Sequence, residues 1–112
     1  MGFLLRQFKI GIANKAAGIR HYEIARESAH LLETTMNPRT FFGRCDDIAL
    51  AEERVTGKAS VFRTDTSRHT KLQIAFIQRL INSGKQTILD DAMNTYQSRW
   101  TAAALEYYNR HR

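Results

Sequence analysis

Few side chains in this sequence have the spacing that a metal centre requires. Glu27 and His30 form a Glu-x-x-His pair, and this i, i+3 spacing places two ligands on one face of a helix in carboxylate-bridged di-iron bundles. Such a centre also needs a second pair and two further carboxylates, and the sequence contains no second Glu-x-x-His. We therefore interpret Glu27 and His30 as solvated surface residues, and we expect no metal and no cofactor.

The single cysteine is also a poor candidate for catalysis. Cys45 is spaced with Phe41 and Ile48 as on one helix face, which predicts a buried thiol. Its neighbours Asp46 and Asp47 would raise its pKa, whereas a nucleophilic thiol needs a basic setting. The sequence has no glycine-rich phosphate loop and no G-x-S-x-G motif. We expect a protein that is not an enzyme.

Positive charge is concentrated in one segment. The net charge is +6, and residues 58–85 hold six basic groups against one acidic group. Such a cluster can bind nucleic-acid phosphates, and the other interpretation is a solvated basic surface. The candidate nucleic-acid contacts are Lys58, Arg63, Arg68, Lys71 and Arg79.

Residues 50–63 resemble the helix-turn-helix of repressor families. The positions that match are Leu50, Ala51, Ser60, Val61 and Arg63. The resemblance implies that a second helix over 60–66 carries the basic cluster into the major groove of DNA. The sequence departs from that pattern in the turn, where Val55 stands in place of glycine and Gly57 comes two residues late. If the chain turns at Gly57 instead, the segment closes a plain helical hairpin.

A second stretch resembles small uncharacterised helical proteins of Gram-positive bacteria and their mobile elements. It runs from Thr35 to Arg44 and continues at residues 75–79. The resemblance implies helices and no particular activity, so it assigns no functional residue.

The whole chain of 112 residues predicts one all-α domain. We expect an antiparallel bundle of about four helices, over residues 14–36, 38–56, 67–83 and 86–110, of which the first and last are the longest. Residues 1–12 either pack on the bundle or form a separate N-terminal arm. Asn37 and Pro38 are a strong helix start, and Gly57 is a suitable stop.

Apolar residues recur at helical spacing in the first and last helices. The first stripe contains Ile19, Tyr22, Ala25, Ala29, Leu32 and Met36, and the last contains Leu89, Met93, Tyr96, Trp100, Ala103 and Tyr107. Tyr108 lies beside the last stripe, so Tyr96, Trp100, Tyr107 and Tyr108 are candidate residues of a protein interface.

These observations favour a binding protein, by protein–protein contact or self-association to a homo-oligomer. The alternative is a nucleic-acid-binding protein that uses residues 58–85. No apolar run approaches the roughly 18 residues of a membrane span, and one cysteine gives no sign of an oxidising compartment. We expect no membrane partner and a cytoplasmic location.

Overall fold

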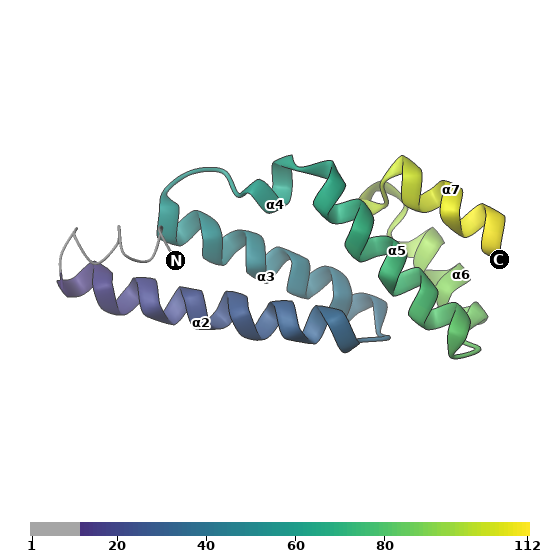
Figure 1. Cartoon of the computed structure of the whole chain (residues 1–112), viewed down its shortest axis with the longest axis horizontal. Helices are drawn as coiled ribbons and strands as arrows, with labels where there is room; N and C mark the ends of the chain where they lie inside the picture. Colours follow the sequence, from purple (N-terminus) through teal and green to yellow (C-terminus); the bar gives the residue numbers. More distant parts are fainter. Residues whose placement is uncertain (1–11) are drawn as a thin grey trace.

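The computed structural model describes residues 12–112, and the side chains from Glu23 onward. Every element in this part of the chain is helical, which confirms the all-α prediction (Figure 1). The elements are α2 (Ile12–Thr34), α3 (Pro38–Thr56), α4 (Val61–Thr64), α5 (Thr66–Asn82), α6 (Gln86–Thr95), the 3₁₀ turn η1 (Gln97–Arg99) and α7 (Ala102–His111). Residues 1–11, and with them the expected N-terminal arm, lie outside the described part.

The helices α2 and α3 form an antiparallel hairpin (Figure 1). At the start of α3, the side-chain oxygen of Asn37 accepts a hydrogen bond from the N–H of Thr40 at 3.1 Å, and Pro38 occupies the first turn. At its end, Gly57 adopts the left-handed conformation with φ of 69°, and its N–H donates to the carbonyl of Glu53. Both ends of α3 lie where the capping residues predict them.

The buried stripe of α2 is narrower than predicted: Leu32 and the half-buried Ala25 lie on it as predicted, but Ser28 takes the place of Ala29. Ser28 and Leu32 are almost fully buried, whereas Ala29 and Met36 are exposed. The helix α2 packs mainly against α3 and makes few contacts with α5. The side of α2 that faces away from α3 is therefore exposed to solvent. The side chains of Ile19 and Tyr22 lie outside the described part of the chain.

Stacked aromatic rings form the centre of the core. The rings of Phe41 and Phe76 join α3 to α5, with centroids 4.4 Å apart. Phe42 meets Tyr96 at 4.5 Å and the edge of Trp100 at 5.0 Å. These contacts hold α3 against α5 and against the segment that follows α6.

The predicted single helix over 86–110 is wrong, because the chain leaves the helix between Tyr96 and Thr101. Trp100 has extended backbone angles, and Thr101 starts α7 by accepting the N–H of Ala104 at 3.2 Å. The Trp100 indole N–H donates to the carbonyl of Ala92, one of the last in α6, at 3.2 Å. The last helix therefore has only 10 residues and is not among the longest.

A buried glutamine holds this break in place. The side chain of Gln73 is only 2% exposed. Its amide nitrogen donates to the carbonyl of Arg99, and its amide oxygen accepts from the N–H of Thr101, both at 2.9 Å. Where the helix is interrupted, the carbonyl of Arg99 and the N–H of Thr101 have no helical hydrogen-bond partner. The side chain of Gln73 supplies a partner for both of them.

Replacing Gln73→Met should lower the free energy of unfolding by about 2 kcal/mol or more, because it leaves an N–H and a carbonyl without their partner. Urea denaturation followed by circular dichroism measures this change. Gln78→Met, at an exposed position of the same helix, is the control and should change little. Equal losses in the two variants would contradict the role given to Gln73.

Candidate functional site

Two arginines of the basic segment are engaged by an acidic pair at the end of α3. The Nε of Arg63 donates to Glu53 at 2.8 Å, and Arg68 lies 4.0 Å from Glu52. Ser60 adds to this cluster, with its hydroxyl donating to Glu52 and its N–H to Glu53. The N–H of Ser60, followed by Arg63, lowers the pKa of the Glu53 carboxyl. Much of the local positive charge is therefore balanced within the chain.

A third arginine of the segment has a structural position. Arg79 donates to the carbonyl of Leu32 at 2.6 Å and to that of Thr35 at 3.0 Å, so it caps the last turn of α2. Partial burial lowers its pKa. Of the five candidate contacts, only Lys58 and Lys71 are exposed without an ion pair in the described part of the chain.

The turn of a helix-turn-helix does not form at residues 50–63. Val55 is 2% exposed and lies inside α3, and the chain turns at Gly57 instead. The next helix, α4, has only four residues, so the expected reading helix over 60–66 is also absent. The physical reason is that glycine enters the left-handed region freely, whereas a β-branched residue does not.

The candidate interface aromatics belong largely to the core. Trp100 is 6% exposed and Tyr108 is 8% exposed, while Tyr96 and Tyr107 are partly buried against the same cluster. The break before α7 changes the phase of the last helix, so that Ala104 and Tyr108 face inward. The prediction that Tyr108 lies off the core is therefore wrong.

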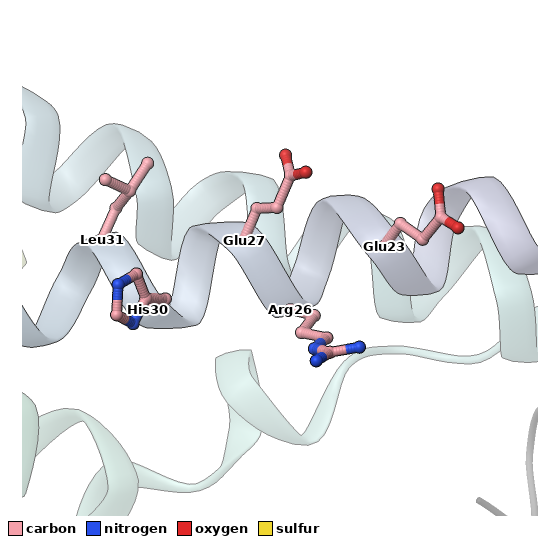
Figure 2. Close-up of a pocket in the computed structure, with 5 residues that line it drawn as sticks. All are labelled: Glu23, Arg26, Glu27, His30 and Leu31. Atoms are coloured by element: carbon pink, nitrogen blue, oxygen red, sulfur yellow. The ribbon is translucent and has the colours of Figure 1, made fainter.

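The Glu-x-x-His pair does not converge. In Figure 2 the side chains of Glu23, Glu27 and Leu31 point upward from α2, whereas those of Arg26 and His30 point downward, although all five line one pocket. Both Glu27 and His30 are exposed. Among the described residues, no group of three or more His, Cys, Asp or Glu side chains could hold a metal ion.

Cys45 is buried, as its position on the apolar stripe predicts. The side chain is 4% exposed, and burial raises the pKa of its thiol to about 12. The nearby Arg99 opposes this shift, and Asp46 adds to it. The thiol is therefore protonated at neutral pH, which is the opposite of what a nucleophile needs.

The structure exposes an apolar surface that the sequence analysis missed, and we name it the hairpin face. It consists of Ile24 and Leu31 on α2 and Gly43, Asp47, Leu50 and Arg54 on α3. Ile24 and Leu50 line one shallow groove with Asp47 and Arg54, and Leu31 lies two turns beyond Ile24 on the same side of α2. The apolar members are 38–46% exposed. The sequence does contain one indication of this surface. Ile24 and Leu31 are seven residues apart, which places them on one side of a helix and off the predicted stripe.

Comparison with protein-family models, curated proteins and solved structures gives no significant match. The resemblance to helical proteins of Gram-positive bacteria therefore stays a prediction. No helix among the described residues is both long and apolar enough to cross a membrane. The function must be argued from the surfaces of the molecule.

A partly buried hydrogen bond between Tyr108 and Asp90 makes the stability of the fold depend on pH. The hydroxyl of Tyr108 donates to Asp90 at 2.5 Å, and this bond, followed by that from Gln86, lowers the pKa of the Asp90 carboxyl. A lowered pKa in the folded state stabilises the fold above the ordinary aspartate pKa of about 3.9, and the stabilisation is lost as the pH falls through the folded value. Tyr108→Phe should therefore destabilise the protein at pH 7, by a margin that shrinks below about pH 4.

Urea denaturation across this pH range measures the margin. Tyr107→Phe is the matched control, because the hydroxyl of Tyr107 has no hydrogen-bond partner in the described part of the chain. A margin for Tyr108→Phe that stays constant with pH would contradict the role given to Asp90.

Proposed function

We propose that this protein is a non-enzymatic binding module that associates with a second copy of itself through the hairpin face. The observation that carries the proposal is the arrangement of charge around Leu50. Asp47 precedes this exposed leucine by three positions and Arg54 follows it by four, on the same side of α3. In a two-fold contact centred near Leu50, Asp47 of each copy meets Arg54 of the other.

Contacts within the chain leave Asp47 and Arg54 free to pair with a second copy. Asp47 pairs with Arg44 at 3.3 Å, but both side chains are about 40% exposed or more, so this pair is weak. Arg54 has no ion pair in the described part of the chain. An opposing copy can therefore supply the better partner for each.

Gly43 supports a close approach on the same surface. It lies inside α3, where glycine costs about 1 kcal/mol relative to alanine. A Cβ at this position would meet no atom within 4 Å, so no contact described here requires glycine. A helix of a second copy that packs closely against α3 would explain why glycine occupies this position.

The shape of the molecule fits this assembly. The described chain measures 51 × 22 × 21 Å, and at one end the hairpin is a layer of only two helices (Figure 1). Two such layers packed face to face would form a four-helix arrangement that buries Ile24, Leu31 and Leu50 on both sides. This interface uses α2 and α3, and not the aromatic residues Tyr96, Trp100, Tyr107 and Tyr108 that the sequence offered as interface candidates.

Leu50→Glu should convert the dimer into a monomer, because it places a charge in the centre of both halves of the contact. Sedimentation equilibrium or light scattering over a range of concentrations measures the change. Ile88→Glu is the matched control, since Ile88 is 41% exposed on α6, outside the hairpin face. This control should leave the dimer intact.

Charge exchange tests the two-fold geometry. Asp47→Arg and Arg54→Asp should each weaken the dimer, because they place like charges opposite each other, and the double variant should restore it. A wild-type protein that stays monomeric at roughly millimolar concentration, which corresponds to a binding free energy weaker than about 4 kcal/mol, would refute the proposal.

Nucleic-acid binding is the second candidate function. It is favoured by Lys58 and Lys71, which are exposed and unpaired in the described part of the chain, and by the net charge of +6. These groups would bind the phosphate backbone without reading the sequence.

The double variant Lys58→Gln/Lys71→Gln should weaken binding to duplex DNA and reduce its salt dependence. Fluorescence anisotropy at several salt concentrations measures both. Arg39 is exposed and lies outside the basic segment, so Arg39→Gln is the control for a lower net charge without a change in the proposed site. Absence of binding by the wild type at about 50 mM salt would exclude this candidate.

A further inference from the structure

We propose that a cleft beside Arg63 and Arg99 binds a phosphate group, either as free phosphate or as the monoester of a small molecule. The cleft has a volume of about 320 Å³ and lies between α3, the start of α5 and the break before α7. Its polar wall contains Arg63, Thr66, His69, Ser98 and Arg99, and Trp100 also lines it. This volume is at the lower end of the range for small-molecule sites, about 300–1,000 Å³, so it suits a small anion.

Several hydrogen-bond donors in the cleft are free. Arg63 uses its Nε for Glu53, but its two terminal nitrogens have no hydrogen-bond partner in the described part of the chain. The hydroxyls of Thr66 and Ser98 also have none there. These groups come from three separate elements and converge on one space, as the oxygens of a phosphate require.

Aromatic rings orient the other two nitrogen-bearing side chains. The guanidinium of Arg99 lies over the ring of Phe42, 5.0 Å from its centroid. The imidazole of His69 meets the ring of Phe62 at 4.8 Å, and its Nδ1 lies 3.4 Å from the carbonyl of Asp65. With Nδ1 donating to this carbonyl, the Nε2 of neutral His69 is an acceptor, which can receive the proton that a phosphate monoanion carries. A site with fixed side chains also loses less entropy on binding.

The backbone of the cleft is fixed as well. The two hydrogen bonds of Gln73 hold the chain at Arg99 and at Thr101, and the indole of Trp100 is anchored on α6. Ser98 and Arg99 therefore keep their positions relative to Thr66 and α5. The cleft is built before any ligand arrives.

Two carboxylates already contact the arginines. Asp46 accepts from Arg99 at 2.7 Å and also lines the adjoining part of the cleft, and Glu53 accepts from Arg63. The side chains of Arg99 and Asp46 are 40% and 51% exposed, and an exposed ion pair of this kind contributes little. Glu53 engages only the Nε of Arg63 and leaves both terminal nitrogens of that arginine unpaired in the described part of the chain. A phosphate carries more charge and three acceptor oxygens, and it matches the planar guanidinium with two parallel hydrogen bonds. A phosphate can therefore bind the terminal nitrogens of Arg63 beside Glu53, and it can displace Asp46 from Arg99.

Trp100 gives a direct readout, because it is the only tryptophan and lines the cleft. Its fluorescence should change saturably when the full-length protein is titrated with sodium phosphate at constant ionic strength, and sodium chloride should have no such effect. A parallel titration with glycerol 3-phosphate distinguishes the two sources, since a monoester site binds it more tightly and a free-phosphate site binds inorganic phosphate more tightly.

Arg63→Gln should raise the dissociation constant about tenfold or more, because it removes charged hydrogen bonds to the ligand. Lys71→Gln removes the same charge from an exposed position outside the cleft and should leave the constant unchanged. The double variant Thr66→Ala/Ser98→Ala keeps both arginines and should also weaken binding, and circular dichroism verifies that each variant is folded.

The proposal would be overturned by a fluorescence response that is linear for both phosphate compounds or equal for chloride. It would also be overturned if Arg63→Gln and Lys71→Gln behaved alike in folded protein. Repeating the titration on Leu50→Glu separates this result from self-association, because the cleft contains no residue of the hairpin face.

Discussion

The amide of Gln73 donates to the carbonyl of Arg99 and accepts from the N–H of Thr101, and the C-terminal third of the molecule depends on this pair of bonds. They allow the chain to leave the helix without stranding polar backbone groups in the interior. The break in turn lets Trp100 enter the core and sets the phase in which α7 packs. The wall of the cleft beside Arg63 and Arg99 and the aromatic centre of the core therefore both depend on this break in the helix.

Some of this fold could be predicted because its determinants are local. Asn37, Pro38 and Gly57 act on neighbours within one helical turn, so the ends of α3 follow from residue type alone. The break before α7 was missed because the apolar spacing continues through it and neither glycine nor proline marks it. Thr101 ahead of three alanines is the only local sign of a new helix start. The partner that makes the break stable, Gln73, lies 28 positions away from Thr101 in sequence.

The candidate sites could be predicted less well, because a charge count does not record partners. Arg63 and Arg68 belong to the basic segment by sequence, yet in space they meet the carboxylates of Glu53 and Glu52. The hairpin face was missed for a related reason, because an apolar stripe does not show which flank of a helix its neighbours leave uncovered. α2 has few neighbours beyond α3, and only the tertiary structure reveals this. The cleft likewise depends on residues that are far apart in the sequence, in the ranges 42–45, 63–73 and 98–101, and only the fold brings them together.

The position of Arg79 has a consequence for how the molecule folds. Its guanidinium reaches the carbonyls of Thr35 and Leu32, 44 and 47 positions away in sequence. Arg79 can therefore cap the last turn of α2 only after α5 has docked, and in the isolated hairpin those two carbonyls would have only water as a partner. This long-range cap links the hairpin to the remainder of the chain, so we expect both parts of the elongated molecule to unfold in one transition.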